Sequence, residues 1–258
     1  MDVVVNFAAE SRNSLAVLDP ERFFRTNVPC TQASLESCRR AGVRRFHHVS
    51  TCKVYGELAL DETAFHEESP YRPRTHMTCR RPARTTPCGR ARRRSTGGRQ
   101  TPTLPGASLF QRIVPLTSTN RCSAICGQLR DDSPDCEGSA RLDHCRAIDA
   151  VLRDGVVGET YHVGTGVEAN VDQIADLVLD ELGLPSSRKS VVADRPGHDR
   201  RYLLDSARIG RELGWRPEIG FEAGVRDTIR WYAANRAWWE PLLQRSTIDE
   251  TAWATTAR

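Results

Sequence analysis

The run Val3-Val4-Val5-Asn6-Phe7-Ala8 begins the stretch that decides the fold, and the run Arg45-Phe46-His47-His48-Val49-Ser50 closes it. Both runs are short and largely apolar, as is typical of buried parallel strands. Between them Pro20 stands at a favourable first position of a helix, Gly42 follows its last turn, and Pro29 should interrupt it. Strand, helix and strand predict a βαβ unit, and therefore an α/β fold on a partial doubly wound, Rossmann-like parallel sheet.

The last part of the chain carries a second set of strand and helix signals. Tyr161-His162-Val163 predicts a strand. Asn170, with Gln173 three residues later, forms a capping box at the start of a helix. Two more helices are predicted over residues 206–213 and 221–235. These elements indicate a smaller C-terminal α/β part.

Composition excludes several classes of protein. The chain has 258 residues, 39% of them hydrophobic, which suits one large domain or two small ones. A net charge of +4 is too small to indicate a nucleic-acid partner, and no apolar run approaches the roughly 20 residues of a membrane helix. Nine cysteines without a CxxC pair or a secretory signal indicate reduced thiols and a cytoplasmic protein.

Residues 72–142 differ from the rest of the chain. Ten arginines lie between Arg72 and Arg99, among Pro, Thr and Gly, and no aromatic residue accompanies them. Such a segment buries too little apolar surface to offset its ordering entropy, so we expect low order over residues 72–106. An arginine-rich RNA-binding arm is the alternative, but the aromatic residues that stack on bases are missing.

Several stretches resemble the nucleotide-sugar branch of the extended short-chain dehydrogenases. The N-terminal ones are Phe7-Ala8-Ala9-Glu10-Ser11, Phe24-Arg25-Thr26-Asn27-Val28, His47-His48-Val49-Ser50-Thr51 and Val54-Tyr55-Gly56. The later ones are Asp143-His144-Cys145-Arg146-Ala147-Ile148, residues 194–202, Glu212-Leu213-Gly214-Trp215 and Trp238-Trp239-Glu240-Pro241-Leu242. Together they resemble the dTDP-glucose 4,6-dehydratase family over about residues 1–71 and 143–243.

The resemblance implies a lyase reaction and a division of the chain. Residues 1–71 correspond to a remnant of the NAD-binding Rossmann domain, residues 143–243 to the nucleotide-sugar-binding part, and residues 244–258 to a tail. The family oxidises C4 of the glucosyl ring, eliminates water across C5 and C6, and returns the hydride to C6, so NAD stays bound through the turnover. The family is homodimeric, but Pro29 and the altered middle segment lead us to expect a poor dimer here.

The same resemblance assigns site residues, and it implies no metal. Ala8, Ala9 and Thr26 match positions that line the cofactor. Ser11 and the loop Asp194-Arg195-Pro196-Gly197-His198 match positions that contact the dTDP-sugar substrate.

The departures from the family fall on its chemistry. The family's Thr-Asp-Glu triplet orients the sugar, protonates the leaving hydroxyl and removes the C5 proton; here it is matched by Thr51, Cys52 and Lys53. The Tyr and Lys of its YxxxK base fall near Met77 and Arg81, and no YxxxK occurs in the chain. Thr51 can still orient substrate, whereas a thiol is a poor acid and an ammonium cannot accept a proton. We therefore expect the chain to be inactive as written.

Two further features suggest an altered reading of the gene. Met1 lies just before what resembles the family's fourth strand, and no GxGxxG occurs, so we expect an N-terminal truncation. If residues 80–89 are back-translated with G+C-rich codons, the resulting DNA can be read in another frame that starts at the third base of each codon. That frame encodes a peptide similar to a helix of the family. Residues 72–142 are therefore interpreted as a frame-shifted segment.

Three alternatives remain. An active epimerase or reductase of the same superfamily would also need the missing YxxxK. A non-catalytic nucleotide-sugar-binding protein needs only the remaining fold. A metal protein using Cys122 and Cys126 lacks the usual partner ligands.

Overall fold

The computed structural model describes residues 2–10, 19–72, 108–110, 135–137, 141–189 and 201–243. Four of its strands form one parallel sheet in the order β1-β2-β3-β5, which are Val3–Asn6, Arg45–Ser50, Ser108–Phe110 and Thr160–His162. Every neighbouring pair in this sheet is parallel, so the expected Rossmann-like α/β class is confirmed. The register pairs Asn6 with His48, and the two strands therefore end at the same edge.

The predicted first helix is two helices, α2 (Pro20–Asn27) and α3 (Pro29–Arg40), which meet at Val28. Proline lacks the amide hydrogen that would continue the helix, so the interruption falls where Pro29 predicted it. The Asp19 side chain accepts a hydrogen bond from the Arg22 amide and caps α2. Most of the altered middle segment lies outside the described residues, so weak dimerisation stays a prediction.

Helix α7 (Arg141–Asp154) contributes several buried residues to the hydrophobic core beside the first sheet. Its buried residues Ala147, Ile148 and Val151 pack with Tyr161 and Trp215, and with partly buried residues of β1 and β2. Helix α9 (Ala207–Leu213) adds the fully buried Ile209 to the same cluster. The C-terminal half of the chain thus supplies one strand and two helices that pack with the N-terminal strands.

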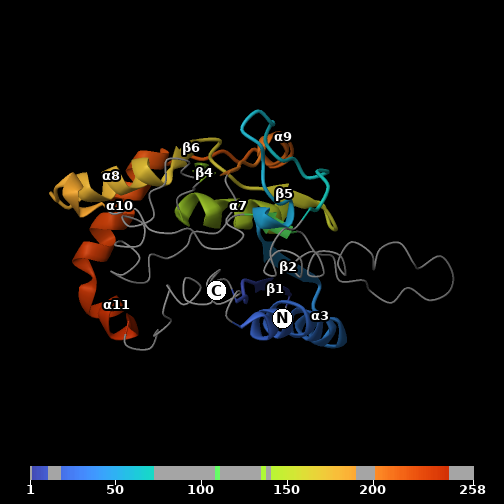
Figure 1. The fold of residues 1–258 in the computed structure, drawn as a ribbon. Coiled ribbons are helices and arrows are strands. Elements are labelled where there is room, and N and C mark those ends of the chain that lie inside the picture. The colour runs from blue at the N-terminus through green and yellow to red at the C-terminus, as the bar shows by residue number, and fades with distance from the viewer. Residues whose placement is uncertain are drawn as a thin grey trace, which may run out of the picture.

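A second sheet has the order β6-β4-β7, formed by Glu168–Asn170, Asp135–Glu137 and Arg201–Tyr202. Its strand β6 leads into α8 (Val171–Glu181), where the capping box of Asn170 and Gln173 is present as predicted. Figure 1 shows α8 with α10 (Phe221–Ala234) and α11 (Arg236–Leu243) gathered at one end of the molecule, away from α3. Two single-turn 3₁₀ helices complete the described elements, η1 (Cys52–Val54) and η3 (Ser186–Arg188).

The middle segment contributes β3 and β4, one strand to each sheet, which the sequence pattern did not indicate. The segment expected to have low order, residues 72–106, lies outside the described residues apart from Arg72. The division of the chain at residues 71, 142 and 243 stays a prediction, although β5 pairs with β3 in the first sheet. No helix in the described ranges is long and apolar enough to cross a membrane.

Arg201 joins the second sheet to the loop after Gly56. Its guanidinium donates to both carboxylate oxygens of Glu168, at 2.6 and 3.0 Å, and to the carbonyl oxygens of Ala59 and Glu62, both at 2.8 Å. The residue is only 8% exposed. Five donors in a planar fork suit this arrangement, which lysine cannot reproduce.

We expect Arg201→Met to lower the free energy of unfolding by about 3 kcal/mol, because it leaves a carboxylate and two carbonyl oxygens without their donor. Urea unfolding followed by circular dichroism measures the change. Arg40→Met is the matched control, since the Arg40–Glu36 pair lies on the surface with Arg40 75% exposed. Equal effects of the two variants would show that the buried arginine has no special role.

Burial lowers the pKa of three histidines around the first sheet to about 4. They are His47 in β2, His144 in α7 and His162 in β5, and His144 lowers the pKa of His47 further. Neither ring nitrogen of His47 has a hydrogen-bond partner among the described residues. Protonation of these rings in the fold is therefore costly.

Between pH 6.5 and 4 the unfolded chain binds protons that the folded chain excludes, so stability should fall as the pH falls. Each buried histidine contributes on the order of 2 kcal/mol over that window. Urea unfolding at pH 7 and pH 5 measures the difference. His47→Leu should reduce the pH dependence, whereas His66→Gln, which changes an exposed histidine, should leave it unaltered.

Candidate active site

Thr51, Cys52 and Lys53 follow β2 directly and lie at the carboxyl edge of the parallel sheet, where ligands bind in folds of this class. Thr51 is extended, with φ −149° and ψ 140°, and the 3₁₀ helix η1 starts after it. Thr51 is 6% exposed and Cys52 is 5% exposed. Cys52 packs with Val54, Tyr55 and Leu204, so its thiol belongs to a small apolar cluster.

The Lys53 ammonium lies over the ring of Tyr202, 4.7 Å from the ring centroid. This cation–π contact requires the charged form of the lysine. Tyr202 belongs to β7, which begins just after residues 194–198, the predicted substrate loop; that loop itself lies outside the described residues. The contact therefore brings the end of β2 next to the strand that follows the loop.

Tyr55 is the nearest tyrosine in sequence, but it is held in a structural hydrogen bond. Its hydroxyl lies 2.7 Å from Nε2 of His162, whose Nδ1 lies 3.2 Å from the carbonyl oxygen of Phe65. Since a carbonyl only accepts, Nδ1 carries the proton and Nε2 accepts from Tyr55. Burial raises the pKa of Tyr55 far above its ordinary value, so its hydroxyl stays protonated and does not replace the missing base.

Two loop contacts fix the chain that leads away from η1. The Glu67 carboxylate accepts a hydrogen bond of 2.9 Å from the His162 amide, and burial raises the pKa of this carboxyl. Gly56 has φ +90°, and a side chain there would lie 2.3 Å from the Arg72 carbonyl oxygen. Only glycine allows residue 72 to return this closely. Tyr71, expected to be structural, rests against the ring of Tyr55 at 5.4 Å.

The residues matched to the cofactor lie beside one another after β1. Asn27 of α2 accepts from the Glu10 amide and donates to the Glu10 carbonyl oxygen, both at 3.0 Å. These two bonds hold the segment of Ala8 and Ala9 against the end of α2, where Thr26 lies. The Asn6 side chain accepts from the Ala8 amide at 3.0 Å and turns the chain away from the sheet.

Asn27 and Asn6 position this edge, although the sequence reasoning assigned them no role. Both are buried, Asn27 at 1% exposure, and buried polar side chains need partners. For Asn6 the signal in the sequence was an asparagine within an otherwise apolar run, whereas Asn27 follows Arg25 and Thr26 and had no such signal. Of the predicted site residues, the structure places Ala8, Ala9 and Thr26 on this edge and Thr51, Cys52 and Lys53 on the neighbouring strand, whereas Ser11 and residues 194–198 fall outside the described residues.

Compared with the Thr-Asp-Glu triplet expected from the family, the segment after β2 has the threonine, Thr51, but neither of the two carboxyl groups. Small side chains at Ala8 and Ala9, with Thr26 next to them, fit one wall of an NAD site. Thr51 places a hydroxyl group at the end of β2. Cys52 and Lys53 supply neither a carboxylic acid nor a carboxylate base, and among the described residues no cluster of three His, Cys, Asp or Glu side chains is arranged to hold a metal ion.

Comparison with known proteins gives consistent matches over both halves. Residues 1–81 match the model of the NAD dependent epimerase/dehydratase family, and residues 133–228 match that of GDP-mannose 4,6 dehydratase. The dTDP-glucose 4,6-dehydratase of Streptomyces antibioticus is 38% identical over 95% of this chain and 74% of its own length. That of Escherichia coli is 33% identical over 96% of this chain and 78% of its own.

A solved structure agrees with these sequence matches. DesIV, the dTDP-glucose 4,6-dehydratase from Streptomyces venezuelae with NAD and TYD bound, superposes with a TM-score of 0.82 at 36% identity. The match covers 94% of this chain and 76% of that one. With the parallel sheet, the threonine at the end of β2 and these similarities taken together, the chain belongs to the dTDP-glucose 4,6-dehydratase family.

Proposed function

We propose that this chain binds the dTDP-sugar of its family without carrying the elimination of water to completion. The proposal rests on the match of Lys53 to the family position whose carboxylate takes the C5 proton, because an ammonium cannot accept that proton. The position of the ammonium over the ring of Tyr202 supports an electrostatic and packing role. Thr51, buried at the end of β2, remains suited to orient a sugar hydroxyl.

NAD is the cofactor of this proposal, because Ala8, Ala9 and Thr26 fit one wall of its site. When bound beside these residues, NAD would supply the hydride acceptor for C4 of the sugar and the hydride donor for C6. The chain's own contribution on this side is to hold the wall in place through Asn6 and Asn27. Substrate contacts are assigned to Ser11, Asp194, Arg195, Pro196, Gly197 and His198 by their match to the family.

Isothermal titration with dTDP tests the binding half of the proposal. We expect saturable binding that Arg195→Ala weakens about tenfold or more, because it removes a charged hydrogen-bond donor for a diphosphate. Arg188→Ala, which removes an exposed arginine outside the loop, is the matched control and should bind normally. A folded protein that shows no heat of binding with dTDP would contradict the proposal.

A further inference from the structure

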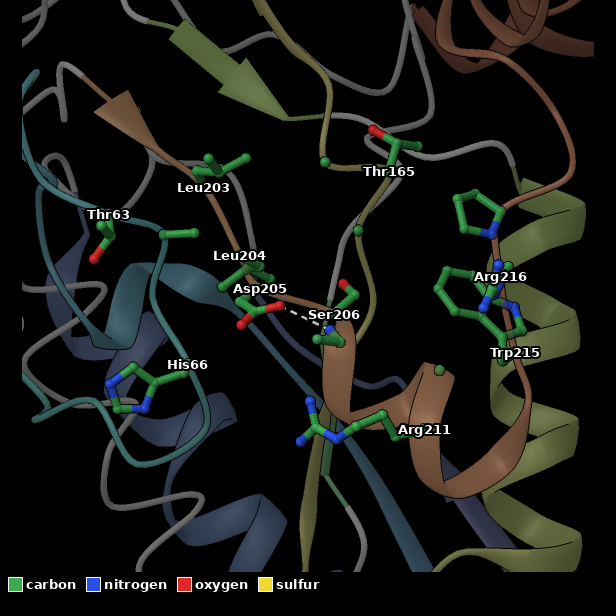
Figure 2. Close-up of a pocket in the computed structure, with 16 residues that line it drawn as sticks. Thr63, His66, Thr165, Leu203, Leu204, Asp205, Ser206, Arg211, Trp215 and Arg216 are labelled. Atoms are coloured by element: carbon green, nitrogen blue, oxygen red, sulfur yellow. Dashed lines mark hydrogen bonds between the residues drawn. The ribbon is translucent and has the colours of Figure 1, made fainter.

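A cleft of about 780 Å³ is lined in part by the loop that follows Gly56. It lies between residues 63–66, the turn Gly164–Gly166 and residues 203–217 around the start of α9. Thr51, Cys52 and Lys53 are not among the residues that line it. Figure 2 shows the Arg211 side chain extending from α9 into this space. A cleft of this size is in the range that holds a small organic ligand.

Two arginines that line the cleft have no ion-pair partner among the described residues, unlike neighbouring arginines. Arg211 and Arg216 make no ion pair with any residue that the structure describes, whereas Arg208 on the same helix pairs with Glu159 and Glu212. Arg226 and Arg230 of α10 likewise pair with nearby acidic residues. The cleft therefore holds two positive charges that are available to a ligand.

The other lining groups narrow the chemistry of that ligand. The hydroxyl oxygen of Ser206 is buried and has no hydrogen-bond partner among the described residues. Asp205 places one carboxylate at the cleft, where it accepts a hydrogen bond of 2.8 Å from the Ala207 amide. The two positive charges of Arg211 and Arg216 outnumber the one negative charge of Asp205, so the charges of these three residues favour an anionic ligand. Leu204 and Trp215 supply an apolar wall, which inorganic anions do not need.

We propose that this cleft binds a small phosphorylated organic molecule, with Arg211 as the main phosphate contact. The Ser206 hydroxyl donates to the same phosphate, Arg216 adds a second positive charge, and the apolar wall contacts the organic part. Arginine suits this task because its planar fork matches two phosphate oxygens. The lining of the cleft includes none of Thr51, Cys52 and Lys53, so the proposed site depends on other side chains than those at the end of β2.

Isothermal titration of the full chain with glucose 6-phosphate at low salt tests the proposal, with inorganic phosphate as a second probe. We expect saturable binding of the sugar phosphate, weaker binding of inorganic phosphate, and little change when dTDP is present in excess. Arg211→Ala should weaken binding about tenfold or more. Arg211→Lys should weaken binding less than Arg211→Ala does, because it keeps the positive charge but loses the planar fork. Arg25→Ala, an exposed arginine of α2, is the matched control and should change nothing.

Circular dichroism of each variant separates loss of the site from loss of the fold. Absence of glucose 6-phosphate binding in the folded chain would overturn the proposal, and so would unchanged affinity in folded Arg211→Ala. Displacement by dTDP would place the ligand in the nucleotide site and overturn the separate cleft. Equal affinity for inorganic phosphate would overturn the assignment to an organic phosphate.

Discussion

Incubation of this chain with dTDP-glucose and added NAD should give no measurable 4-keto-6-deoxy product. We expect the C4 hydroxyl to lack its tyrosine base, because no YxxxK occurs in the chain and the family's Tyr and Lys fall near Met77 and Arg81. The elimination lacks its acid and its base at Cys52 and Lys53, each worth about 10²- to 10⁴-fold in rate. The absorbance of the product in alkali measures the outcome.

Variants separate the two missing steps. Cys52→Asp with Lys53→Glu should not restore turnover, because oxidation at C4 still has no base. Adding Met77→Tyr and Arg81→Lys should be required before any product is seen. Product that scales with the amount of unmodified protein, and is lost in Thr51→Val, would contradict the expectation.

Removal of the Asp143 carboxylate should cause the largest loss of stability in the described structure. Asp143 is fully buried, and its carboxylate accepts from the amides of Glu218 and Ile219 at 3.1 and 3.0 Å and pairs with Arg146. Asp143→Ala leaves these donors without an acceptor, and we expect a loss of about 3–5 kcal/mol. That is a large part of the roughly 5–15 kcal/mol that is typical of the free energy of unfolding of a domain.

Urea unfolding measures the change, and two variants control it. Asp143→Asn keeps the shape and one acceptor oxygen, so it should fall between the wild type and Asp143→Ala. Asp149→Ala removes a carboxylate of the same helix whose pair with Arg153 is exposed, and it should have little effect. If Asp143→Ala unfolds at the same urea concentration as Asp149→Ala, the buried acceptor is not stabilising.

The same carboxyl group adds to the loss of stability in acid. Burial by itself would raise the pKa of Asp143, but the hydrogen bonds from Arg146, Glu218 and Ile219 outweigh burial and lower it. A lowered pKa means that the stabilisation is present above the unfolded value, near 3.9, and is lost as the pH falls through the folded value. The buried histidines act at higher pH, so the two effects are separable by the pH at which they occur.

Local signals determined much of the first sheet and its helices. Apolar runs at residues 3–8 and 45–50 became β1 and β2, Pro29 divided α2 from α3, and the capping box at Asn170 started α8. These features depend on neighbours within a few residues, which the sequence displays directly. The match of Cys52 and Lys53 to the family's acid and base positions is likewise a prediction from the sequence alone.

Tertiary structure decided the contacts between distant segments. The placement of β3 between β2 and β5, the bond from Tyr55 to His162, and the contact of Lys53 with Tyr202 join residues that are about 50 to 150 positions apart. The arginines at 211 and 216 read in the sequence as ordinary surface charges, and only the fold turned them toward a cleft. Pairing across such separations depends on packing and burial, which no local pattern encodes.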